Sequence, residues 1–208
     1  ADVSSEDPET VRKGEALLAE AVRAVRDIGG SKLGGILYSA HTKYATKPTE
    51  RGRKNSIAAI AKTGDLAAEA GIGLVLEVVN RFETNLLNTT AQALDFVGAT
   101  GSDRVTLHLD TFHMNIEEAN PAAAIRLAGD RIGYFHIGES NRGYLGAGSV
   151  DFQRIFAGLA RIGYEGPITF ESFSSVVVSQ PLCGILGIWR NLWEDGEDLA
   201  RHAKSFIE

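Results

Sequence analysis

Five short apolar segments recur along the chain with helix-like stretches between them, and this alternation restricts the fold more than any other feature. The segments are Leu33–Tyr38, Ile72–Arg81, Val105–Asp110, Arg131–Ile137 and Pro167–Phe173. Asn120 followed by Pro121, and Asp151 further on, are typical N-caps of the intervening helices. Strands that alternate with helices in this way indicate right-handed βαβ units around one parallel sheet.

The length of the chain fits one domain of this kind. Its 208 residues are 44% apolar, which is enough for one sizeable core, and no linker or low-complexity segment divides them. We predict an α/β fold of the (β/α)8 TIM-barrel type, as a single domain over residues 1–208. A closed barrel has eight strands, whereas five are recognisable here, so we expect an incomplete barrel.

Charge and cysteine content exclude several classes of partner. The formal net charge is -6 and the basic residues are scattered, so the cationic surface of a nucleic-acid-binding protein is missing. Apolar runs stay below the roughly 20 residues that span a bilayer, which predicts no membrane segment. Cys183 is the single cysteine, which excludes an internal disulfide and favours a reducing compartment. We therefore expect a cytoplasmic protein whose partner is a small molecule.

The segment Val105–Asp110 predicts a strand with two different faces. Apolar and polar side chains alternate strictly along it, which places the apolar set against helices and His108 and Asp110 on the inner side. Asp110 ends the strand, and His113 follows in what we expect to be the loop leaving it. A barrel strand that carries such groups at its C-terminal end indicates an active site there.

Four residues of ligand type lie near the ends of four consecutive strands: Glu77, Asp110, His136 and Glu171. Singly, an acidic residue at a strand end can cap the next helix, and a strand histidine can be a hydrogen-bonded core residue. Four at one register should converge at one end of a parallel barrel, where buried carboxylates require a cation or hydrogen-bond donors. Three carboxylates and one imidazole suit Mn²⁺, Mg²⁺ or Co²⁺ better than a metal that prefers thiolate. The sequence therefore predicts one divalent metal site.

Four motifs around these residues resemble a known family of enzymes. They are Leu76–Glu83 (LEVVNRFE), Leu107–Asn115 (LHLDTFHMN), Phe135–Arg142 (FHIGESNR) and Thr169–Phe173 (TFESF). Together they are similar to the ketose 3-epimerases that act on D-tagatose, D-psicose (D-allulose) and L-ribulose, within the xylose isomerase-like TIM barrels. The resemblance covers almost the whole chain.

The resemblance implies a role for each candidate residue. It implies that one divalent metal, Mn²⁺ before Co²⁺ or Mg²⁺, is bound by Glu77, Asp110, His136 and Glu171. Two of these ligands, Glu77 and Glu171, would also be the catalytic acid/base pair. The sugar substrate would be held by Glu83, His113 and Arg142.

The resemblance also bears on completeness and assembly. The opening Ser5–Pro8 and the segment Gly34–Tyr38 look like the third helix and the fourth strand of the family, so that strands four to eight are visible. We therefore expect the barrel to be incomplete at its N-terminus and the sequence to be a fragment of a longer enzyme. The family further implies a homodimer or homotetramer.

The chemistry of C3 inversion calls for such a site independently. Removing the proton next to the C2 carbonyl of a free ketose requires a Lewis acid on O2 and O3 that stabilises the enediolate. The proton leaves one face of the sugar and returns to the other, so two bases are needed, and Glu77 and Glu171 come from strands far enough apart to flank it. We expect Arg142 and His113 to donate hydrogen bonds to O1 and O2 as negative charge develops.

Other residues are assigned to packing or to solvent. His108 should face inward, either supporting the metal ligands by hydrogen bonding or filling the core. His41 is expected in solvent. A final amphipathic helix is predicted from about Leu186 to Phe206, on which Trp189 and Trp193 would pack.

Alternative functions differ from this one in the residues or the proton transfer that they require. An aldose-ketose isomerase or hydroxypyruvate isomerase of the same superfamily would share the metal and the glutamate pair but move a proton between C1 and C2. An endonuclease-type relative would need more histidine ligands and a basic face, and the sequence has neither. A sugar-binding remnant without activity is the alternative if the chain is this short.

Overall fold

One parallel sheet of five strands, in the order β1-β2-β3-β4-β5, runs through the computed structural model, which describes residues 2–208. Every neighbouring pair is parallel and consecutive in sequence. The strands are β1 (Lys32–Gly35), β2 (Gly73–Glu77), β3 (Val105–Asp110), β4 (Ile132–Ile137) and β5 (Ile168–Phe170). Adjacent strands of a (β/α)8 barrel have this order, and eight of them close the barrel. The predicted α/β class and incomplete barrel are confirmed.

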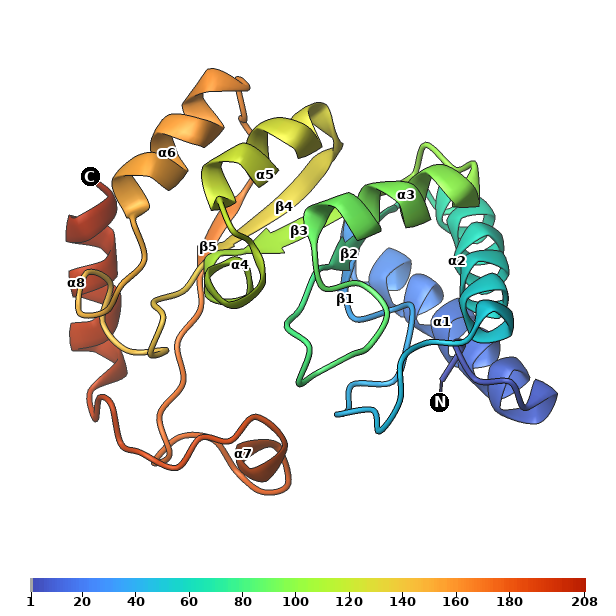
Figure 1. Cartoon of the computed structure of the whole chain (residues 1–208), viewed down its shortest axis with the longest axis horizontal. Coiled ribbons are helices and arrows are strands. Elements are labelled where there is room, and N and C mark those ends of the chain that lie inside the picture. The colour runs from blue at the N-terminus through green and yellow to red at the C-terminus, as the bar shows by residue number, and fades with distance from the viewer. Residues whose placement is uncertain (1) are drawn as a thin grey trace.

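Helices alternate with the strands and pack on one side of the sheet. They are α1 (Pro8–Asp27), α2 (Glu50–Glu69), α3 (Thr90–Thr100), α4 (Thr111–Glu117), α5 (Pro121–Ala128), α6 (Phe152–Arg161), α7 (Leu182–Ile185) and α8 (Gly196–Ile207), with a 3₁₀ turn at Gly129–Arg131. The long helices α1, α2, α3, α5 and α6 contact one another in that order and form an arc around the strands (Figure 1). The short α7 lies apart from this arc, in the long connection between β5 and α8.

Side-chain caps fix where the helices begin. The Asn120 side chain accepts a hydrogen bond from the Ala123 N–H, and the Asp151 carboxylate accepts one from the Arg154 N–H, as the sequence predicts. Thr89 and Gln92 form a reciprocal capping box at the start of α3. The helix starts predicted at Asn120 and Asp151 are thus confirmed.

The apolar face of β3 forms the centre of the core. Val105, Leu107 and Leu109 are fully buried under the helices, together with Leu74 and Leu76 of β2. Burying one such leucine contributes about 1.5–3 kcal/mol to stability. The other face of β3 is therefore the one that remains for polar groups.

The predicted loop at His113 is wrong, because α4 begins directly after β3. The Asp110 carboxylate accepts a hydrogen bond from the Phe112 N–H at 2.7 Å and so caps the helix that starts at Thr111. His113 consequently lies in the first turn of α4 and is 2% exposed. The helix holds its imidazole more rigidly than a loop would.

The predicted final helix from Leu186 to Phe206 is also wrong in its first half. Gly187 has φ of 67° and ends the turn after α7, and α8 starts only at Gly196, where Asp195 caps it. Between them the chain is tied to the segment after β5: the Ser175 N–H donates to the Arg190 carbonyl, and Ser174 Oγ donates to the Trp193 carbonyl. Carbonyls committed to these contacts cannot form helix hydrogen bonds.

Within residues 2–208, none of the helices combines the length and the apolar content needed to cross a bilayer.

Candidate active site

The register of the parallel strands brings the four predicted ligands to one edge of the sheet. Asp110 is the partner of His136 across β3 and β4, and Glu77 ends β2 opposite His108. Glu171 directly follows β5, and its N–H donates to the Ile137 carbonyl at the end of β4. These ends are the carboxyl ends of the strands, where active sites of this fold lie.

Asp110, His136 and Glu171 form a cluster with the spacing of metal ligands. The His136 Nδ1 atom lies 3.8 Å from Asp110 Oδ2 and 3.9 Å from Glu171 Oε1, which is too far for hydrogen bonds. This nitrogen is buried and has no hydrogen-bond partner. One ligand atom from each of the three residues lies within 4.8 Å of the others. A buried ring nitrogen that faces two carboxylates without a bond to either is what a shared cation would explain.

Glu77 borders this cluster from the β2 side. It groups within the same 4.8 Å limit with Asp110 and His113, and separately with His108 and His136, but not with Glu171. Burial and the nearby carboxylates of Asp110 and Glu171 raise the pKa of Glu77 to about 7. Because this rise comes partly from crowded negative charge, a cation among the carboxylates would relieve it. The donor set therefore fits a hard divalent metal.

Arg142 spans two of the predicted ligands. Its Nη1 atom lies 3.2 Å from Asp110 Oδ2 and 2.5 Å from Glu171 Oε2, while its guanidinium stacks 3.7 Å above the Phe112 ring. Burial alone would raise the pKa of Asp110, but His136 and the Arg142 charge lower it overall. Asp110 is therefore held as a carboxylate inside the site, where it is available to a cation.

The hydrogen bonds of His113 define which of its nitrogens carries the proton. Its Nδ1 atom accepts from the Asn80 backbone N–H at 3.1 Å and faces Asn80 Nδ2 at 2.9 Å. Burial lowers the pKa of His113, which favours the neutral ring. Since Nδ1 accepts, the neutral ring carries its hydrogen on Nε2. That donor faces Glu77 Oε1 at 3.7 Å and Asp110 Oδ2 at 3.9 Å.

Glu83 lies in a second group of polar residues at the rim. Asn80 Nδ2 donates to its Oε1 atom at 2.7 Å, and His41 Nε2 lies 3.0 Å from its Oε2 atom. The hydrogen bond to Glu83 raises the pKa of His41, and His41 in turn lowers that of Glu83 against the effect of burial. His41 is exposed, as the sequence predicts, and its ring remains 35% exposed while it pairs with Glu83.

Sequence reasoning missed Asn80 and His41. Asn80 lies inside the motif Leu76–Glu83, where two polar residues three positions apart after a strand could have indicated it. His41 lies in a loop 42 residues before Glu83, so that no local spacing relates the two. Only the fold brings them together.

A cavity of about 330 Å³ opens at this edge of the sheet. Its polar wall consists of His41, Glu77, Glu83, His113, Arg142 and Glu171. Its other side is apolar and includes Ile36, Phe173 and Leu182. All five residues that the sequence assigns to catalysis or to substrate binding thus line one cavity, next to the candidate ligands.

His108 and the tryptophans lie elsewhere. The His108 ring packs edge-on against His136, with ring centroids 4.1 Å apart, and its Nε2 atom has no hydrogen-bond partner. The expected support of the ligands by hydrogen bonding is therefore not found, and packing remains. Trp189 is 72% exposed, and Trp193 donates from Nε1 to Ser172 Oγ at 2.7 Å. Neither tryptophan is on a helix.

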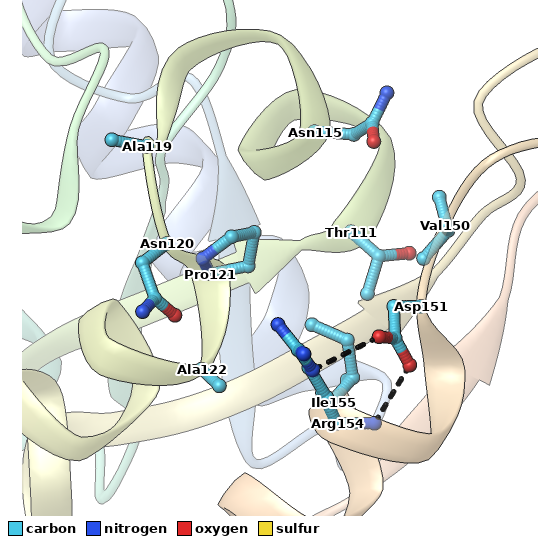
Figure 2. A pocket seen from close by; sticks show the side chains of 10 residues that line it. All are labelled: Thr111, Asn115, Ala119, Asn120, Pro121, Ala122, Val150, Asp151, Arg154 and Ile155. Atoms are coloured by element: carbon cyan, nitrogen blue, oxygen red, sulfur yellow. Dashed lines mark hydrogen bonds and ion pairs between the residues drawn. The ribbon is translucent and has the colours of Figure 1, made fainter.

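A second hollow lies between α4, α5 and the start of α6, and Figure 2 shows the side chains that line it. Thr111 is its nearest residue to the site, and its Oγ atom donates to the Gly138 carbonyl. Asp151 and Arg154 face each other across 3.2 Å. The hollow contains none of the predicted site residues, and its charged side chains neutralise one another.

Comparison with known proteins agrees with this geometry. A family model for xylose isomerase-like TIM barrels matches residues 1–207. The chain is 51% identical to an L-ribulose 3-epimerase of Methylomonas sp. over 207 residues, covering 100% of this chain and 72% of that protein. It is 52% identical to an L-ribulose 3-epimerase of Mesorhizobium japonicum over 206 residues, covering 99% of this chain and 69% of that protein. The structure of a D-allulose 3-epimerase from Methylomonas sp. in complex with D-allulose matches with a TM-score of 0.97 at 51% identity, over 99% of this chain and 72% of that chain.

The family model and the parallel sheet define the class, a xylose isomerase-like TIM barrel. Within this class the chain belongs to the ketose 3-epimerases, a family of enzymes. The family predicted from the four motifs is thereby confirmed.

Proposed function

We propose that the protein is a metal-dependent epimerase that inverts C3 of a free ketose, of the D-tagatose, D-psicose, D-fructose or L-ribulose type. The observation that carries this proposal is the presence of Glu77 and Glu171, from separate strands, in one cavity beside the candidate ligand cluster. Its relatives are L-ribulose and D-psicose 3-epimerases by name, and one related structure contains D-allulose.

Glu77 and Glu171 act as the acid/base pair in this proposal. C3 inversion needs one group to remove the proton and a second to return it on the opposite face, through a cis-enediolate of the sugar. A carboxyl group with a pKa close to the working pH does both well, and the pKa of Glu77 is raised to about 7. Burial likewise raises the pKa of Glu171, while the Arg142 charge opposes the rise. Glu77 can therefore exchange a proton near neutral pH, and the pKa of Glu171 is shifted in the same direction.

His113, Arg142 and Glu83 hold the substrate. Arg142 Nη2 and His113 Nε2 are 3.4 Å apart, and both are donors, so that they cannot satisfy each other. An acceptor oxygen between them would receive both hydrogen bonds, which would strengthen as negative charge develops on the enediolate. Glu83, fixed by Asn80 and His41, offers a carboxylate acceptor to a sugar hydroxyl.

Glu77, Asp110, His136 and Glu171 would hold the metal. The oxygen-rich set with one nitrogen favours Mn²⁺, with Co²⁺ or Mg²⁺ as substitutes. When bound, such an ion would act as a Lewis acid toward the carbonyl and hydroxyl oxygens of the ketose. Asp110 keeps its charge for this purpose because His136 and Arg142 lower its pKa.

The proposal is tested by solvent exchange. The protein is incubated in D₂O with Mn²⁺ and a panel of ketoses that includes D-tagatose, D-fructose, D-psicose and L-ribulose, and deuterium is located by NMR. We expect deuterium at C3 together with the C3 epimer, and loss of both in Glu171→Gln. Deuterium at C1 or C2 with an aldose product would instead indicate an isomerase. Metal binding without any exchange would indicate the inactive sugar-binding alternative.

Assembly and location are proposals of a different kind. We propose a homodimer or homotetramer, by analogy with the family, and a cytoplasmic location, from the single cysteine. Sedimentation analysis at several protein concentrations tests the first, and a monomer at all of them would refute it.

A further inference from the structure

Arg142 has an unusual backbone conformation for a residue with a long side chain. Its φ is 61°, and it is the one non-glycine residue with positive φ in the part of the chain that the structure describes. Such a conformation persists only where the surroundings enforce it. The Arg142 N–H donates to the Glu139 carbonyl at 2.9 Å, which fixes one side of the residue.

The other side of Arg142 is fixed by a chain of hydrogen bonds that begins outside the active site. Trp193 Nε1 donates to Ser172 Oγ at 2.7 Å, and Ser172 Oγ donates to the Arg142 carbonyl. The Phe173 N–H donates to the same carbonyl at 3.2 Å. An indole N–H can only donate and a carbonyl can only accept, so the direction of the chain is determined. Hydrogen bonds aligned in this way strengthen one another.

The segment that carries Trp193 is itself anchored. Ser174 is fully buried, and its hydroxyl donates to the Trp193 carbonyl at 2.7 Å and to Asn191 Oδ1. Trp193 is thus held both at its backbone carbonyl and at its ring nitrogen. Trp189, four residues earlier on the same connection, is 72% exposed and serves as the natural comparison.

We propose that Trp193 is a positioning residue of the active site, which acts through Ser172 on the backbone of Arg142 and thereby aims the guanidinium at Asp110 and Glu171. The kinetic part of this inference rests on the proposed epimerase function. The chain from indole to hydroxyl to carbonyl links the connection after β5 to the group that faces the substrate. Trp193 does not line the cavity and belongs to none of the candidate ligand groups, so its effect is indirect.

Two-dimensional ¹H–¹⁵N NMR tests the chain of hydrogen bonds without requiring activity. The protein has two tryptophans, so Trp189→Phe leaves Trp193 as the single indole signal. We expect Ser172→Ala to shift that signal upfield. Trp193→Phe should shift the amide signals of Arg142 and Phe173, whereas Trp189→Phe should leave them in place. Unchanged Arg142 and Phe173 signals in a folded Trp193→Phe protein would overturn the proposal.

Kinetics separate a positioning role from a packing role. We expect Trp193→Phe to lower kcat/KM about fivefold, the effect of one hydrogen bond, with unchanged Mn²⁺ affinity. The double variant Trp193→Phe with Ser172→Ala should lose no more than Ser172→Ala alone, because both changes break one path. Losses that multiply would overturn the proposal, as would a Trp193→Phe rate equal to that of Trp189→Phe. If Trp193→Phe does not fold, Ser172→Ala carries both measurements. A wild-type protein without activity would refute the proposed function, and the NMR result alone would then decide the inference.

Discussion

The two faces of β3 differ in role: one packs in the core, and the other carries groups of the candidate active site. On one face Val105, Leu107 and Leu109 are fully buried beneath helices and contribute stability. On the other face His108 and Asp110 are equally buried, but they lie among carboxylates and imidazoles that repel one another or lack hydrogen bonds. Burial therefore has opposite effects on the two faces. On one face it stabilises the fold, and on the other it places charged groups in an unfavourable environment that a bound cation and substrate would relieve.

The largest expected effect is on catalysis, from a change on the polar face. Glu77→Gln removes one of the two proposed bases, which is also a proposed metal ligand, so we expect C3 deuterium exchange to fall by about 10³-fold. The same change removes a crowded negative charge, so the metal-free protein should become more stable rather than less. Exchange followed by NMR and thermal unfolding check the two halves. The exposed Glu165→Gln is the control, and it should change neither quantity.

A change on the apolar face should lower stability and leave metal binding intact. Leu107→Ala leaves a cavity in a fully buried position and should lower the free energy of unfolding by about 3 kcal/mol. Urea denaturation measures this loss, and Leu107→Met, which keeps the volume, should lose less than about 1.5 kcal/mol. The folded fraction should bind Mn²⁺ with wild-type affinity. A large loss of metal affinity in folded Leu107→Ala would show that the two faces are not separable.

Raising the pH should have opposite effects on two properties: it should lower the stability of the metal-free protein and raise its affinity for Mn²⁺. The pKa of Glu77 rises from an ordinary 4.5 to about 7 in the folded protein. Its contribution to the stability of the metal-free protein is therefore complete below pH 4.5 and is lost as the pH rises through about 7. Mn²⁺ affinity should instead rise with pH, by about tenfold per unit below the pKa of Glu77, because one proton competes with the ion. Calorimetric titrations at several pH values measure the affinity.

Glu77→Gln provides the control for this pH dependence. The variant has no titrating group at this position. Its stability and its Mn²⁺ affinity should therefore both depend less on pH between pH 5.5 and 8 than those of the wild type, by the equivalent of about one proton. A wild-type Mn²⁺ affinity that is independent of pH over this range would contradict the account of Glu77.

The smallest expected effect comes from a site that belongs to neither face. Thr89→Ala removes the capping box at the start of α3 and should lower the free energy of unfolding by about 1 kcal/mol. Metal affinity and exchange should not change. Thr89→Ser, which keeps the hydroxyl, should restore most of the stability.

Much of the fold and of the site could be predicted from the sequence, because both follow from local patterns. The alternation of apolar and polar residues along Val105–Asp110 determines which face is buried, and the caps at Asn120 and Asp151 mark where helices begin. The occurrence of Glu77, Asp110, His136 and Glu171 in successive βα units, each at the end of a strand, is enough to place them at one edge of the sheet.

The features that could not be predicted depend on contacts between distant segments. The connection after β5 is not helical near Trp193 because Ser174 and Ser175 engage its carbonyls, and this pairing leaves no periodic signal. His41 reaches Glu83 from another loop for the same reason. The helix that carries His113 is different, because its signal is local. An acidic residue at the end of a strand can bind a metal or cap the next helix, and Asp110 does cap α4.

The most direct test of the central claim is to locate a bound Mn²⁺ by anomalous scattering in crystals of the protein grown with MnCl₂. We expect one strong peak within about 2.0–2.3 Å of oxygens from Glu77, Asp110 and Glu171 and of the His136 Nδ1 atom. An ion elsewhere, or four side chains that remain apart while Mn²⁺ is bound to other groups, would contradict it.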